Sequence, residues 1–296
     1  MQGEFYKYHP LTNFIFFIVT IAFSMFILHP VFLGISLISS ITYSILLNGK
    51  KAIKFNLIYM LPTMIIAVLL NALTNRRGTT VLLVITDNIT ITYEALIFGI
   101  AAAIMIVCVI CWFSCYNKIM TTDKFVYLFG KAIPSLSLVI SMIFRFVPRF
   151  KDQFKKTAMA QKCLGNDISQ GNIVNRVKSF IKIVSIMMSW ALENSVETAD
   201  SMKSRGYGLR GRSSFSIYKF SNGDFAIISY IILLATYIVI GIIQGKIDYT
   251  YYPMVTAQLH SLYTIIIFFA YALLCFLPII IDIKEDIKWK YLRSKI

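Results

Sequence analysis

The sequence predicts an all-α polytopic membrane protein, with about six transmembrane helices and a large cytoplasmic segment of amphipathic helices. One reason is composition: hydrophobic residues make up 57% of the 296 residues and charged residues only 15%. Soluble domains carry about 25% charged residues, because polar side chains must cover their surface. The other reason is that the basic residues are clustered between long apolar stretches.

The apolar stretches are the predicted transmembrane helices. A helix of roughly 20 apolar residues crosses the hydrocarbon core of a bilayer. Six stretches come close to this length, and none of them contains Asp, Glu, Lys or Arg. They are Leu11–His29, Val31–Leu47, Phe55–Ala72, Ala95–Asn117, Phe225–Ile243 and Leu259–Ile281.

The distribution of Lys and Arg predicts the orientation, because cytoplasmic segments carry the excess. Seventeen of the 29 basic residues lie between Asn117 and Asp224, and five follow Ile281. The opposite side has only Arg76, Arg77 and Lys246. Both termini and the central segment are therefore expected in the cytoplasm. The net charge of +15 reflects these segments rather than a nucleic-acid partner.

Three regions follow from this pattern. Residues 1–117 form a membrane domain with four helices, and residues 118–223 form the cytoplasmic segment. Residues 224–296 contain two further transmembrane helices and a basic tail.

The central segment is expected to form two or three amphipathic helices. Ile133–Val147 is apolar but short, carries Arg145 and is interpreted as a separate helix that lies under the membrane. Breaks are predicted at Pro148 and near residues 165–171. From Ile173 onward, apolar residues recur at helical spacing and give one continuous stripe.

The sequence lacks the usual marks of catalysis or ion-coupled transport. Ionisable residues inside membrane spans are costly and mark function, and the predicted spans have none. No G-x-x-x-x-G-K-[ST] loop is present, so the chain is not expected to be an enzyme that hydrolyses ATP. Cys108, Cys111 and Cys115 share one helix face without accompanying His or carboxylate, which favours apolar packing over a metal site.

Several stretches, in their order and spacing, resemble the transmembrane (T) component of energy-coupling factor (ECF) transporters, the EcfT/CbiQ-like family. The resemblance covers most of residues 8–220. The matching stretches are Tyr8–Thr12, Asn71–Gly78, Arg145–Phe150, Ala160–Gly165, Trp190–Asn194 and Met202–Gly208.

The resemblance implies a non-catalytic subunit of an ATP-driven ABC importer for vitamins or transition-metal ions in a prokaryotic cell membrane. It implies two ABC-type ATPase subunits that bind ATP and Mg, and a small substrate-binding membrane subunit. No cofactor or metal is expected in the chain itself. Two cytoplasmic coupling helices of the family end in short Ala-Arg-Gly-like signatures that dock on the ATPases.

The first signature corresponds to Cys163, Leu164 and Gly165, and the second to Ser204, Arg205 and Gly206. Leu164 stands where the family has Arg, so the first signature lacks the expected ion pair and is left with apolar docking. Supporting roles are expected for Arg145, Arg149 and Lys203, and for the acidic residues Glu193, Glu197 and Asp200. The acidic residues form a solvated stripe, pair with the many local Lys and Arg, or meet basic residues of a partner.

Two other functions remain open from the sequence. An autonomous secondary transporter or channel would need no partner. A membrane-bound enzyme would use the basic segment to hold an anionic lipid or nucleotide, although no cluster of carboxylates or His supports it.

Overall fold

The computed structural model describes residues 3–75, 78–86, 89–132, 134–166, 168, 172–207, 209, 218–247, 249–257 and 262–293. The chain divides into two compact units. The first, here called the membrane unit, consists of residues 1–124 and 218–296. The second, the inserted unit, consists of residues 125–217.

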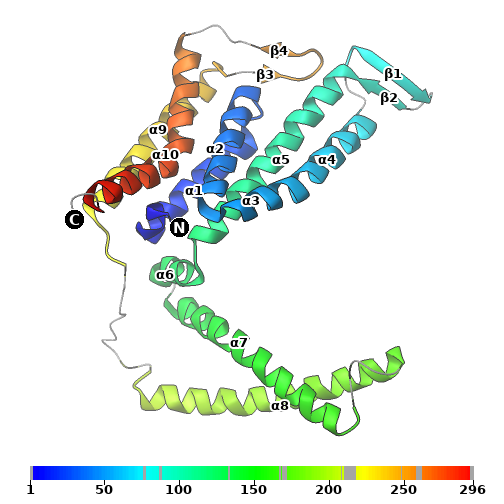
Figure 1. The fold of residues 1–296 in the computed structure, drawn as a ribbon, viewed down its shortest axis with the longest axis vertical. Helices are drawn as coiled ribbons and strands as arrows, with labels where there is room; N and C mark the ends of the chain where they lie inside the picture. Colours follow the sequence, from blue (N-terminus) through cyan, green and yellow to red (C-terminus); the bar gives the residue numbers. More distant parts are fainter. Residues whose placement is uncertain are drawn as a thin grey trace. The chain divides into compact units, whose positions relative to one another are not determined.

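The membrane unit is a helical bundle (Figure 1). In chain order its elements are η1 (Glu4–Lys7), α1 (Pro10–Phe26), α2 (Pro30–Asn48), α3 (Lys50–Phe55), the π-helical turn η2 (Asn56–Met60), α4 (Leu61–Thr74), β1 (Val81–Thr86), β2 (Ile89–Thr92), α5 (Tyr93–Ile119), α9 (Asn222–Ile243), β3 (Tyr249–Thr250), β4 (Thr256–Ala257) and α10 (Leu262–Arg293). A further helix, α6 (Thr122–Ala132), starts in this unit and continues into the inserted unit.

The predicted fold class is confirmed, because five helices among the described residues are long and apolar enough to cross a membrane. They are α2, the continuous stretch Ala52–Thr74, α5, α9 and α10. The first predicted span, Leu11–His29, is shorter than expected: α1 ends at Phe26 and has 17 residues. Most of its side chains are apolar, and it packs against α5 and α9.

Two helices of the membrane unit begin with the same His-Pro pair. The Nδ1 atoms of His9 and His29 each accept the N–H two residues on, from Leu11 and Val31, at 3.2 Å. Proline suits the first helical position because its missing N–H would have no partner there. The histidines therefore act as N-caps of α1 and α2.

The bundle core combines aromatic rings with a face of small polar residues on α2. Trp112 of α5 lies edge-on to Phe16, with the ring centroids 5.8 Å apart, and its Nε1 donates to Ser36 Oγ at 3.0 Å. Ser36, Ser39, Ser40 and Ser44 are buried on the same helix. Small residues allow helices to approach closely in a membrane, so this face brings α2 close to α5 and α10.

The cysteines on α5 contribute to the same interface. Cys108, Cys111 and Cys115 are all buried. Cys108 Sγ lies 3.7 Å from the carbonyl oxygen of Leu33, and Cys111 Sγ lies 3.7 Å from Met60 Sδ. Among the described residues no group of His, Cys, Asp or Glu has metal-site geometry.

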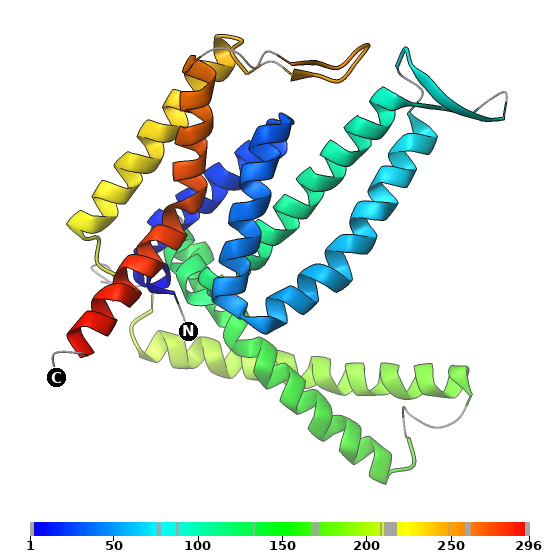
Figure 2. The ribbon, with the colours of Figure 1, turned by 45° about the horizontal axis from the view of Figure 1, so that its top comes forward.

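One feature of the membrane unit was not predicted from the sequence. Strands β1 and β2 form an antiparallel hairpin between α4 and α5, which extends beyond the ends of these two helices (Figure 2). At its base the buried carboxylate of Glu94 accepts hydrogen bonds from the hydroxyls of Thr79 and Thr80. Arg76 and Arg77 lie outside the described residues.

The inserted unit contains two long helices, α7 (Pro134–Cys163) and α8 (Ile173–Ser204), and most of α6. The predicted break near residues 165–171 is confirmed, because it separates α7 from α8. The predicted break at Pro148 is wrong, and so is the separate helix ending near Val147, because α7 runs through Pro148. Proline deprives the carbonyl four residues earlier of its donor. That residue, Phe144, is exposed, so the lost hydrogen bond is not buried.

Candidate functional site: the helix ends of the inserted unit

The two long helices of the inserted unit cross and pack through matching stripes. On α8 the stripe consists of Ile183, Met187, Trp190 and Asn194, and on α7 of Phe150, Phe154, Thr157 and Gln161. Both stripes have the spacing i, i+4, i+7 and i+11, which places their members on one side of a helix. Polar residues take part, since Thr157, Gln161 and Asn194 are all buried.

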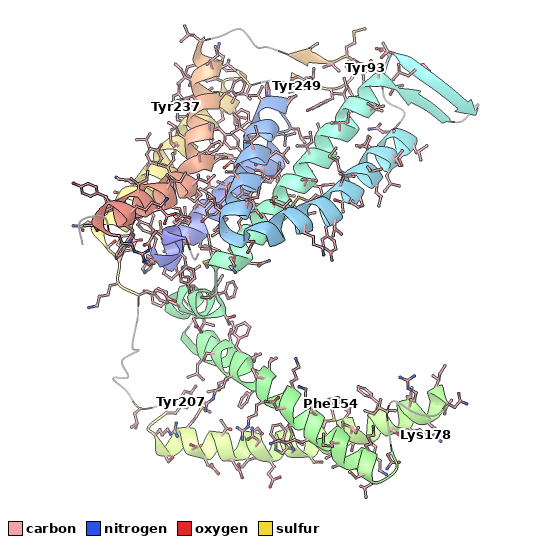
Figure 3. All side chains as sticks on the ribbon, viewed as in Figure 1. Tyr93, Phe154, Lys178, Tyr207, Tyr237 and Tyr249 are labelled. Atoms are coloured by element: carbon pink, nitrogen blue, oxygen red, sulfur yellow. The ribbon has the colours of Figure 1, made fainter. Side chains whose placement is uncertain are left out.

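Aromatic contacts fix the crossing point. The rings of Phe150 and Trp190 meet edge to face with centroids 5.2 Å apart, and Phe154 lies 6.3 Å from Phe180. Thr157 Oγ1 is 3.9 Å from Met187 Sδ. Figure 3 shows Phe154 where α7 and α8 cross, with Tyr207 at the far end of α8. Both helices continue well beyond the crossing.

The first signature closes the C-terminus of α7. The N–H of Gly165 donates to the carbonyl of Lys162 at 3.1 Å, and the N–H of Asn166 donates to the carbonyl of Gln161 at 2.9 Å. Gly165 has a φ of +82°. This pair of bonds around a left-handed glycine is a Schellman motif, which satisfies carbonyls at the helix end. The side chains of Asn166 and Gln161 add a hydrogen bond of 3.1 Å.

The second signature closes α8 in the same way. The N–H of Gly206 donates to the carbonyl of Lys203, and the N–H of Tyr207 to the carbonyl of Met202, both at 3.0 Å. Gly206 also has a φ of +82°. Cys163 and Ser204 are the last helical residues, and Leu164 and Arg205 are the residues that precede the glycines. The two signatures are therefore copies of one backbone structure.

Both ends are open to a partner. Leu164, immediately before Gly165, is 73% exposed. Arg205 is exposed at the C-terminal end of α8, where the helix dipole favours a cation. The two helix ends therefore present different side chains, one apolar and one cationic.

The supporting residues fall in different places. Arg149 lies at the crossing, with its guanidinium carbon 5.8 Å from the centroid of the Trp190 ring. Arg145, one turn earlier, is exposed. Lys203 is in the last turn of α8, and its carbonyl accepts the Gly206 N–H. Of these three basic residues, Lys203 is the one that adjoins a signature in the chain.

The acidic residues Glu193, Glu197 and Asp200 are exposed along α8. The structure shows no ion pair for them within the part of the chain that it describes. Pairing with local cations, one of the interpretations from the sequence, has no support there, and the solvated stripe and the contact with a basic partner stay predictions. The carboxylates lie between the crossing and the second signature.

Sequence reasoning did not identify Gln161 and Asn166, which complete the first helix end. It also missed Asn194, which is buried at the crossing. The only signal in the sequence is that Gln161 belongs to the stretch Ala160–Gly165. Its side-chain bond to Asn166 depends on the fold at the helix end.

A bundle of apolar helices with an inserted pair of long amphipathic helices defines a multi-pass helical membrane protein. The family described as cobalt transport protein (CbiQ) matches residues 7–217, which include both signatures. The chain belongs to this family, the transmembrane T components of energy-coupling factor transporters.

Individual relatives are named as energy-coupling factor transporter proteins. The chain is 32% identical over 108 residues to the energy-coupling factor transporter transmembrane protein EcfT of Lactobacillus helveticus, and 34% identical over 109 residues to that of Staphylococcus aureus. These alignments cover 36% of this chain and 39% and 41% of the two relatives. The EcfT of Macrococcus caseolyticus is 28% identical over 188 residues, or 60% of this chain and 68% of the relative.

Proposed function

We propose that the chain is the coupling scaffold of an ATP-driven ECF-type importer. Two ABC-type ATPase subunits dock on the signatures of α7 and α8 and bind ATP and Mg. A small substrate-binding membrane subunit is held by the membrane unit. The chain itself passes the movement of the ATPases to that subunit and performs no chemistry.

The observation that carries this proposal is the pair of identical helix ends. A pair of ATPases presents two similar docking grooves, and the chain offers two exposed ends with the same backbone structure. A glycine at each end lets the backbone approach a groove closely. Arg205 adds a rigid, permanently charged fork that can pair with a carboxylate.

The crossing of α7 and α8 supports transmission of movement. Packed helices move as rigid bodies or slide by small shear steps. Because buried residues and aromatic contacts join the two helices, a displacement of one docked end moves the other helix as well.

The proposed cargo is a vitamin or a transition-metal ion, and the chain resides in a prokaryotic cell membrane with both termini in the cytoplasm. The family description names cobalt, whereas the three relatives are named only as energy-coupling factor proteins. The cargo is expected to depend on the substrate-binding subunit.

Copurification tests the proposal. The tagged chain is isolated from its native membranes in mild detergent, and its companions are identified by mass spectrometry. Two ATPase subunits and a small membrane protein should copurify, and the complex in liposomes should take up its cargo only with ATP. A chain that purifies alone and transports without ATP would instead be an autonomous transporter.

A further inference from the structure

The N-terminal segment Phe5–Asn13 holds a lysine at the start of α6. Lys124 is only 1% exposed. Its ammonium group donates to the carbonyl of Tyr6 and lies 3.9 Å from the centroid of the Tyr6 ring. With the Asn13 amide oriented to satisfy its neighbours, Asn13 Oδ1 accepts from Lys124 Nζ at 3.0 Å and Nδ2 donates to the Phe5 carbonyl at 3.1 Å.

The same segment holds an aspartate at the start of α9. Asp224 is 3% exposed. Its Oδ1 accepts the N–H of His9 at 2.8 Å and the hydroxyl of Thr12 at 3.1 Å. Its Oδ2 accepts from Ser221, which is the N-cap of α9. One oxygen therefore serves the capping box of α9, and the other binds the N-terminal segment.

A third contact fixes the segment to the bundle. The N–H of Phe5 donates to Oδ1 of Asp282 on α10 at 2.8 Å. The Phe5 ring is fully buried and lies edge-on to Phe16 of α1, with centroids 5.4 Å apart. The segment is thus anchored in the core of the membrane unit.

Lys124 and Asp224 lie close in sequence to the two points where the chain passes between the units. Lys124 is the last residue of the membrane unit before the inserted unit, and the chain returns to the membrane unit at Tyr218. Where the chain re-enters the membrane unit, Phe220 also contacts the segment, with the centroids of the Phe220 and His9 rings 5.2 Å apart. Both passages between the units are therefore attached to the same short segment.

The contacts of Lys124 and Asp224 go beyond what is needed to cap α6 and α9. The capping box of α9 uses only Oδ2 of Asp224, and a buried ammonium is costly unless it is paired. Here two buried charged groups, 100 positions apart, are both satisfied by backbone and side-chain groups of one segment. This arrangement fixes the first residues of α6, up to Lys124, relative to the start of α9.

We infer that residues Phe5–Asn13 form a clamp that positions the starts of α6 and α9, so that a movement of the inserted unit acts on both passages together. The inference rests on the proposed coupling function for its consequence, but the clamp itself can be tested on the isolated chain.

Spin labels measure the clamp directly. Asp123 and Phe225 are exposed in the first turns of α6 and α9. Both are replaced by Cys for labelling, in a chain that carries Cys163→Ser because Cys163 is exposed. The distance distribution between the labels is then recorded by pulsed EPR for the otherwise wild-type chain and for Thr12→Val, Lys124→Met and their combination.

The clamp predicts a narrow distribution in wild type that broadens in Thr12→Val and Lys124→Met and broadens most in the combination. Thr236→Val is the matched control, because within the described part of the chain that hydroxyl bonds only to the Leu233 carbonyl of its own helix. An unchanged distribution in the clamp variants would overturn the inference. Equal broadening in Ser221→Ala would also overturn it, because it would show that Asp224 acts only through the cap of α9. Thr12→Val removes a single hydroxyl and keeps the test decisive if Lys124→Met does not fold.

The second measurement is uptake per ATP hydrolysed by the copurified complex in liposomes. The clamp variants should retain the ATPases and lose uptake several-fold at similar hydrolysis. Wild-type uptake per ATP in a variant with a broadened distribution would show that the clamp does not serve coupling. If no ATPase copurifies with the wild-type chain, the proposed function fails, and the spin labels still decide whether the clamp exists.

Discussion

Leu164 and Arg205 occupy the same position in two copies of one backbone motif, each immediately before a glycine with a φ of +82°. The two helix ends have the same backbone conformation, but the side chains before the glycines differ. One end presents an exposed apolar group and the other a cation. The difference gives each end its own prediction.

Arg205→Glu should abolish assembly with the ATPase pair, or ATP-dependent uptake, while membrane insertion stays intact. A desolvated charge pair at an interface loses ~2–5 kcal/mol when one partner is removed, and reversing the charge adds repulsion. Copurification and membrane fractionation measure the two effects. Lys182→Glu makes the same charge change on an exposed part of α8 and should leave assembly intact. Unchanged uptake in Arg205→Glu would remove Arg205 from its proposed role.

Leu164→Arg should be tolerated and should retain or strengthen assembly. The substitution restores the residue type that the family has at this position, on a backbone that matches the second signature. Because Leu164 is exposed, the longer side chain meets no steric conflict within the described part of the inserted unit. Quantitative copurification against wild type is the measurement. Loss of the ATPases would mean that the first end docks by apolar contact alone.

Gly206→Ala should weaken the second helix end more than Gly165→Ala weakens the first. A left-handed backbone costs a residue with a Cβ about 1–2 kcal/mol, and both glycines share this cost. At Gly206 the new Cβ would also lie 3.1 Å from Leu209 Cδ1, whereas at Gly165 the space is open.

Hydrogen exchange in the last turns of α7 and α8 measures the two effects. Gly34→Ala is the control, since Gly34 is helical and has nothing within 4 Å of its Cβ position. Equal loss of protection at the two ends would contradict the prediction.

Ile183→Ala should loosen the crossing of α7 and α8. Ile183 is fully buried, and truncation of a buried isoleucine typically costs about 2–5 kcal/mol. Hydrogen exchange across the middle of α8 should rise, and the complex should lose coupling efficiency. Ile186→Ala serves as the control because Ile186 is 39% exposed. If both variants behave alike, the packing at the crossing does not depend on the Ile183 stripe.

Much of the fold follows from local patterns. Long apolar runs without charge predict the membrane helices, and Gly165 with its polar neighbours marks the end of α7. Pro148 misled the prediction, because a proline on an exposed helix face costs less than one in a core. The β1–β2 hairpin was missed, although Val81–Thr86 and Ile89–Thr92 are rich in the β-branched residues that favour strands.

The candidate site was also predicted only in part from the sequence. The signature residues could be located from their resemblance to the family. Their equivalence depends on hydrogen bonds from Gly165 and Gly206, which no composition or spacing reveals. The clamp could not be predicted at all, because His9 and Asp224 are 215 positions apart and each looks like an ordinary residue at a helix start.

Acidification should destabilise the membrane unit through His29. Its Nδ1 caps α2 by accepting the Val31 N–H, and burial among aromatic rings lowers the pKa of His29 below its ordinary value of 6.5. A protonated Nδ1 cannot accept, so the unfolded chain binds the proton more readily than the folded one. Stability is therefore full above the unfolded pKa and falls as the pH drops below it.

Thermal unfolding in detergent at neutral and mildly acidic pH measures this loss. His29→Asn keeps a capping acceptor without titrating, so it should lose less stability on acidification than wild type. An equal loss in both proteins would assign the pH dependence to other groups.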